Sequence, residues 1–86
     1  MNKPLDYYLE LTYKLVVVDE KDGYTAYYPD LPGCMTCGET PDELFANALD
    51  AKKCWFEACL KDDINIPEPS DVLNFQVGSF IGKYHV

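Results

Sequence analysis

One long segment with helical periodicity limits how this chain can fold. Thr40-Pro41-Asp42-Glu43 forms a capping box, with Thr at the N-cap, Pro at the first helical position and Glu at the third. At about 100° per residue, the apolar residues that follow fill one broad arc. They are Leu44, Phe45, Ala48, Leu49, Ala51, Trp55, Phe56, Ala58, Cys59 and Leu60. The pattern predicts a surface helix that ends near Leu60 or Lys61 and lies on a sheet, with Trp55 as its largest anchor.

Lys52 falls in the middle of this apolar arc, between Phe45 and Cys59. A long amphipathic side chain can bury its stem while its charged head reaches water. We therefore interpret Lys52 as a snorkelling lysine at a gap in the packing. The alternative is a charge presented to a partner.

The segments before the helix have strand character. Tyr13 to Asp19 is β-branched and too short for a helix, and its apolar run predicts a central strand covered on both faces, or nearly so. Asp22-Gly23 is a hairpin signal, so Tyr24 to Tyr28 should return antiparallel. Pro29 to Gly33 must form a bend, since neither proline can donate to a strand ladder. Cys34 to Cys37 reads as a short third strand.

The ends of the chain carry weaker signals. Pro4 to Leu11 favours a short helix, and Ile66 to Ser70 an extended linker. Val72 to Val77 alternates like a last strand, and Lys83 to Val86 is compatible with extended structure. The predicted class is α+β, in the order (α)βββαβ: a three-stranded antiparallel meander, one long helix packed on the sheet, and a returning fourth strand.

Charge and composition narrow the function classes. The 86 residues suffice for one domain with a small core, and the net charge is −8. Such a surface repels nucleic acid and attracts a basic partner. No segment has the length of an apolar membrane span, and the N-terminus lacks the pattern of a signal peptide. We expect a cytoplasmic location, where the four cysteines stay reduced.

Metal and catalytic sites have little support in the sequence. Cys34 and Cys37 have zinc-ligand spacing, but Cys54 and Cys59 lie about 140° apart around a helix and cannot easily share a metal. The acids cluster at turns and at the helix start, whereas a two-metal nuclease needs carboxylates from the middle of adjacent strands. His85 is the only histidine, and no Ser or Cys has a plausible His–acid pair. We expect no catalytic residue, no metal and no cofactor.

Many spaced residues between Tyr13 and Ser70 together resemble the HicB antitoxin family. They are Asp22-Gly23-Tyr24, Pro29-Asp30-Leu31-Pro32-Gly33-Cys34, Thr36, Gly38, Thr40, Glu43, Asn47, Ala48, Ala51, Trp55, Ile66-Pro67 and Pro69. The resemblance implies a partial ribonuclease-H-like fold without a working active site. It also implies a partner, the small basic HicA toxin that cleaves messenger RNA, whose active surface the antitoxin covers.

The same resemblance divides the chain into a core, residues 1–70, and a last strand with a tail, residues 71–86. Many family members continue into a C-terminal DNA-binding module, and Gly82 to Val86 looks like the opening strand of a ribbon-helix-helix module. We therefore expect that this chain does not bind operator DNA. Autorepression of the operon is expected only of a longer form that includes the DNA-binding module.

The predicted partner contacts lie on the bend, on tyrosines and on the polar helix face. They are Tyr24, Tyr27, Asp30, Leu31, Pro32, Gly33, Asp42, Glu43, Asp50, Lys52 and Glu57. A homodimer or larger oligomer is also expected, through edge strands at Tyr24–Tyr28 or Val72–Val77. Two alternatives stay open: a cysteine-based metal-binding or nuclease-like domain, and an oligomeric scaffold without a toxin partner.

Overall fold

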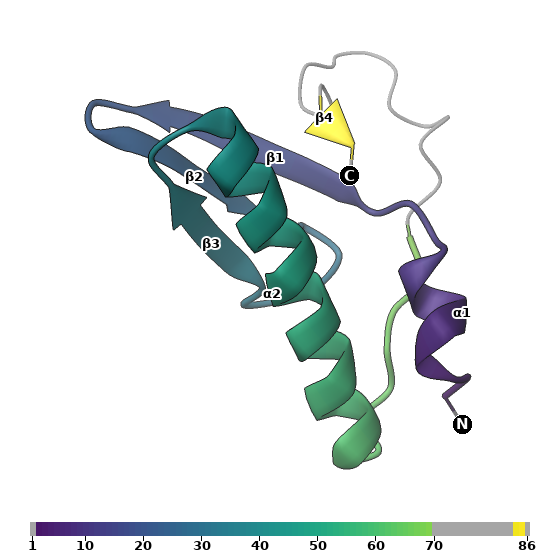
Figure 1. Ribbon diagram of the computed structural model, residues 1–86. Coiled ribbons are helices and arrows are strands. Elements are labelled where there is room, and N and C mark those ends of the chain that lie inside the picture. The colour runs from purple at the N-terminus through teal and green to yellow at the C-terminus, as the bar shows by residue number, and fades with distance from the viewer. Residues whose placement is uncertain (1, 70–83, 86) are drawn as a thin grey trace.

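The fold is a small antiparallel sheet with one long helix laid across it (Figure 1). The computed structural model describes residues 2–69 and 84–85. The sheet order is β3-β2-β1-β4, and every pair of neighbouring strands is antiparallel. The elements are α1 Leu5–Leu9, β1 Lys14–Glu20, β2 Gly23–Tyr27, β3 Met35–Gly38, α2 Pro41–Lys61 and β4 Tyr84–His85. The predicted α+β class and the three-stranded meander are confirmed.

Local hydrogen bonds cap both ends of helix α2. The Glu43 backbone N–H donates to Thr40 Oγ1 at 3.1 Å, and the Glu39 N–H donates to the Glu43 carboxylate at 2.8 Å. At the other end Asp63 has a φ of 56°, while the Ile64 N–H donates to the Cys59 carbonyl at 2.8 Å. This is a Schellman motif, which satisfies carbonyls that the helix leaves unpaired. The predicted bounds of the helix are confirmed.

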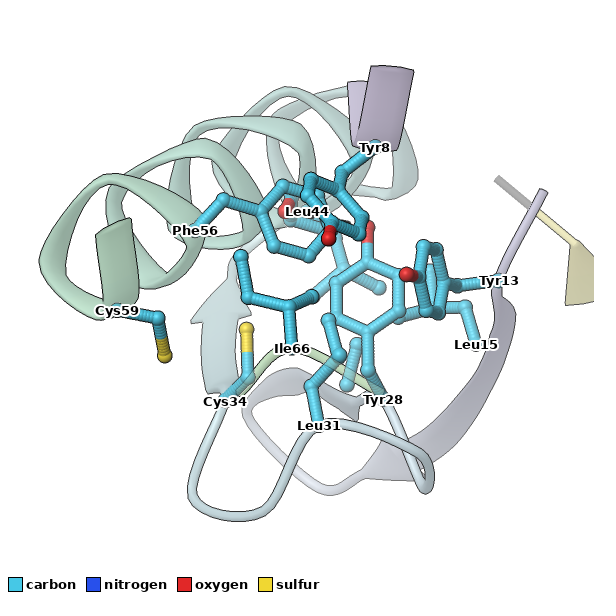
Figure 2. Packing of buried hydrophobic residues seen from close by; sticks show 12 residues of the cluster. Tyr8, Tyr13, Leu15, Tyr28, Leu31, Cys34, Leu44, Phe56, Cys59 and Ile66 are labelled. Carbon is cyan, nitrogen blue, oxygen red and sulfur yellow. Dashed lines mark hydrogen bonds between the residues drawn. The ribbon is translucent and has the colours of Figure 1, made fainter. Parts of the chain in front are cut away.

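The core lies between α2 and the face of the sheet that α2 covers (Figure 2). Phe56 from the helix and Tyr13 and Leu15 from the first strand region are completely buried. Tyr8 of α1 and Ile66 of the segment after α2 close the same cluster from its side. Long-range packing therefore joins both flanking segments to the sheet and helix.

The prediction that the first strand is covered on both faces is wrong. Leu15 is buried, but Val18 on the opposite face is 41% exposed. Successive residues of a strand point to opposite faces, and α2 lies on one face only. Among the described residues, β1 is therefore covered on one face only, although its apolar run is unbroken.

Two further expectations about the elements need correction. The apolar arc of α2 is narrower than predicted, because Leu49 and Ala58 are exposed. The Tyr24–Tyr28 strand is not an edge, because β2 pairs with β1 on one side and with β3 on the other. The outer strands of the described sheet are β3 and β4.

The C-terminal predictions fall largely outside the described residues. Val72–Val77, predicted as the last strand, lies wholly there, as does most of the tail from residue 71 to residue 86. The fourth strand of the described structure is β4, in which Tyr84 pairs with Leu15 and His85 with Lys14. Within the described chain, no helix is long and apolar enough to cross a membrane.

Candidate partner-binding surface

The bend between β2 and β3 consists of two consecutive turns. The Leu31 N–H donates to the Tyr28 carbonyl at 3.0 Å, and the Cys34 N–H donates to the Leu31 carbonyl at 2.9 Å. In the second turn Pro32 fixes the first central position, and Gly33 takes the second with a φ of 81°. Proline followed by a residue with positive φ is the signature of a type II turn. The predicted bend is confirmed, and its conformation follows directly from its sequence.

Two anchors hold this bend against α2. Leu31 is completely buried in the core, so its side chain is inaccessible in the free chain, and its role as a partner contact stays a prediction. The Trp55 indole N–H donates to the Pro32 carbonyl at 3.0 Å. Trp55 therefore fastens the helix to the bend, whereas Phe56 is the anchor that packs on the sheet. The bend presents Pro32 and Gly33 outward as a fixed structure, with Asp30 half-buried beside them.

Lys52 lies inside the core and not at its edge. The residue is only 3% exposed, and its ammonium group lies 5.6 Å from the centre of the Tyr28 ring and 5.9 Å from that of Tyr13. The snorkelling interpretation is therefore wrong, since it requires the charged head to reach water, whereas a contact of Lys52 with a partner stays a prediction. Burial lowers the pKa of Lys52, and the nearby Cys34 partly opposes this. The aromatic rings supply the cation–π contacts that a buried ammonium needs.

The four cysteines differ in their exposure. Cys34 and Cys59 are buried, whereas Cys37 and Cys54 are exposed. Burial raises the pKa of the Cys34 thiol to about 11, despite the opposing charge of Lys52. A thiol with this pKa is protonated at neutral pH and is a poor nucleophile and metal ligand. In the part of the chain that the structure describes, no three Cys, His, Asp or Glu side chains could hold a metal ion together.

The structure spreads the predicted contacts over several surfaces. Tyr27 is 39% exposed on the sheet face away from α2, while Tyr24 packs partly against the core on the helix side. The acids are all exposed on α2, in the first turn at Asp42 and Glu43 and further along at Asp50 and Glu57. Tyr27 and the helix acids therefore come from different surfaces, the open side of the sheet and the exposed side of α2.

An acidic hollow of about 530 Å³ lies where the β1–β2 turn, the end of β3 and the start of α2 meet. Glu20, Asp22, Glu39 and Glu43 contribute carboxylates to its lining, against one lysine, Lys21. It is open to solvent. This end of the molecule suits basic groups of a partner better than acidic ones.

Sequence reasoning missed the apolar surface on the sheet face away from α2. Val18 and Met35 are 41% and 61% exposed there. The signal was present, since Val16 and Val18 alternate with the buried Leu15. It was hidden because Val17 is also apolar, so the strand reads as a continuous run instead of an alternating one.

Comparison with known proteins relates both the sequence and the fold to one family. Residues 13–79 match the family model of the HicB-like antitoxin of bacterial toxin–antitoxin systems. The chain is 40% identical over 53 residues to antitoxin HicB 1 of Photorhabdus laumondii, covering 62% of this chain and 34% of that protein. It is 32% identical over 62 residues to a 14.9 kDa protein of Haemophilus phage HP1, covering 72% of this chain and 47% of the phage protein.

Two solved structures share the fold. A chain of the HicA3 and HicB3 toxin–antitoxin complex superposes with a TM-score of 0.64 and 27% identity, covering 71% of this chain and 72% of that one. The antitoxin HicB3 structure superposes with a TM-score of 0.62 and 26% identity, covering 71% of this chain and 45% of that one. The chain spans less than half the length of the two curated relatives. With a family match over residues 13–79 and this shared fold, the chain belongs to the HicB-like antitoxin family.

Proposed function

We propose that this chain is an antitoxin that binds a HicA-like toxin and keeps it inactive by covering its active surface. The observation that carries the proposal is the fold shared with a chain of the HicA3–HicB3 complex, at a TM-score of 0.64 over 71% of this chain. The family match over residues 13–79 supports the same function.

Electrostatics support a basic partner. The chain has fifteen acidic residues against seven basic ones, and its net charge is −8. HicA toxins, by the family resemblance, are small basic proteins that cleave messenger RNA. Opposite net charges steer two proteins together and raise the association rate at low salt. Binding should therefore weaken and slow as salt screens these charges.

The mode of action is occlusion without chemistry by the antitoxin. The described carboxylates lie mainly at turns, at the ends of elements and along the exposed side of α2. The two exposed thiols, Cys37 and Cys54, come from different elements, β3 and α2. A nuclease or metal-dependent mechanism has no comparable arrangement of described residues to support it.

Co-expression with the neighbouring gene tests this function. A short basic reading frame beside this gene, with a central Gly-x-His, is the expected toxin. Its induction alone should arrest growth, and co-expression of this chain should restore growth and yield a co-purifying complex. Persistent growth arrest together with no complex would contradict the proposal and favour a scaffold without a toxin partner.

A further inference from the structure

One face of the sheet carries α2, and among the described residues no element lies on the other face. On this second face, Val16 of β1 aligns with Tyr27 of β2, and Tyr27 aligns with Met35 of β3. The next row runs from Val18 through Thr25 to Cys37 in the same way. Since alternate residues share a face, these six side chains form one patch, called here the open sheet face.

The open sheet face carries most of the exposed large hydrophobic side chains of the described residues. The described chain has five exposed large hydrophobic side chains, at Val18, Tyr27, Met35, Leu49 and Ile64. The first three lie on this face, at 41%, 39% and 61% exposure. None of the six residues of the patch is charged. A contiguous exposed apolar patch marks an interaction surface, and aromatic and Met side chains are enriched in interface cores.

Charged residues lie at the ends of the patch and not within it. Glu20 follows Val18 on the same face of β1, and Asp22 and Glu39 are exposed at the same end of the sheet. Lys14 lies at the opposite end of the β1 row. The end near the β1–β2 turn is thus an acidic rim on an apolar centre. Such a surface fits a partner with an apolar patch bordered by basic residues.

A second copy of the chain fits this surface less well. Each copy carries a net charge of −8, and a face-to-face dimer would bring two such charges together. The net charge of −8 attracts a basic protein but repels a second copy of the chain. The charge balance therefore selects a partner of opposite sign.

We propose that the open sheet face is the docking surface for the toxin, with Val18, Tyr27 and Met35 at its centre and Glu20 and Asp22 at its acidic rim. This inference rests on the proposed antitoxin function and specifies which surface performs it. It places the toxin on the side of the sheet away from Asp50 and Glu57 of α2.

The chain contains a matched pair of thiols that tests the placement without any substitution. Cys37 lies on the open sheet face and Cys54 on the exposed side of α2, and both are exposed. The purified chain is alkylated with iodoacetamide alone and in complex with its toxin, and each cysteine is quantified by mass spectrometry. We expect the toxin to slow labelling of Cys37 at least tenfold and to leave that of Cys54 within twofold. Protection of Cys54 with unchanged labelling of Cys37 would overturn the placement.

Matched lysine substitutions give a second, independent test by isothermal titration of the toxin. Met35→Lys and Leu49→Lys each replace an exposed apolar side chain by a positive charge, on the open sheet face and on α2 respectively. A basic partner should lose at least about tenfold in affinity to Met35→Lys, as at an interface hot spot, and less than about twofold to Leu49→Lys. Val18→Lys repeats the test from β1 if Met35→Lys lowers the melting temperature.

The outcomes separate the surface from the function. If wild-type protein binds toxin but the open-face variants bind equally well, the placement is wrong and the antitoxin function stands. If the open-face variants change the oligomeric state in light scattering without weakening toxin binding, the face belongs to a second copy. If the wild-type chain binds no toxin at all, both proposals fail together.

Discussion

Gly33 and Gly38 are held to glycine by different backbone constraints. Gly33 follows Pro32 in a type II turn and has a positive φ of 81°. Gly38 has another reason to be glycine, because a Cβ there would lie 2.7 Å from the Leu44 backbone nitrogen. This contact arises because β3 approaches the start of α2. The ammonium group of Lys52 likewise lies against Tyr13 and Tyr28 from the sheet side.

Alanine at these two glycines should have unequal effects. Gly38→Ala forces β3 away from the helix backbone and should destabilise the fold by about 2 kcal/mol or more, like other overpacked sites. Gly33→Ala meets no atom within 4 Å and should cost only the strain of a positive φ, about 1 kcal/mol. Urea denaturation of both variants measures the difference. An equal or smaller loss in Gly38→Ala would contradict the close approach of β3 and α2.

The secondary-structure elements were largely predictable because their signals are local. Capping chemistry marks the ends of α2, and prolines separate β2 from β3. Local signals could not show how many faces of a strand are buried. The apolar run from Leu15 to Val18 is compatible with one buried face or with two. The burial of Leu31 and Lys52, two residues of the predicted contact set, could not be predicted for a related reason, since both are buried by tertiary packing. The remaining predicted contacts are accessible or partly so, and their role stays a prediction.

The N-cap of α2 should contribute measurably to stability. Thr40→Ala removes the acceptor for the Glu43 N–H, a bond of 3.1 Å, and should lower the free energy of unfolding by about 1 kcal/mol. Thr40→Ser keeps the hydroxyl and should stay within about 0.5 kcal/mol of wild type. Thermal or urea unfolding distinguishes the two. If serine costs as much as alanine, the hydroxyl is not the stabilising group.

The free energy of unfolding of the whole domain should fall at alkaline pH. Burial raises the pKa of the Cys34 thiol from 9.0 to about 11 and that of the Tyr13 phenol from 10.0 to about 12. Because the unfolded chain releases these protons first, the stability they contribute is complete below about pH 9 and is lost between about pH 9 and 12. The lowered pKa of Lys52 acts in the opposite direction, since its burial penalty is relieved as pH rises toward 10.5.

A variant isolates the thiol from the other groups. The difference in unfolding free energy between wild type and Cys34→Ala should shrink as pH rises from about 9 to 11, because only wild type carries the thiol whose pKa burial raises. Urea denaturation at three pH values across this window measures it. A difference that does not change with pH would show that the Cys34 thiol ionises equally in the folded and unfolded states.

At the scale of the whole molecule, the chain is a small acidic domain. Its sheet has one face covered by α2 and one open face, and a bend of two turns joins β2 to β3. The test of its proposed function is a titration of purified toxin with this chain, followed by the rate at which the toxin cleaves messenger RNA. Cleavage should fall in proportion to added antitoxin and stop near equimolar amounts, with higher salt requiring more antitoxin because the attraction is partly electrostatic. Undiminished cleavage in the presence of excess folded antitoxin would contradict neutralisation by binding.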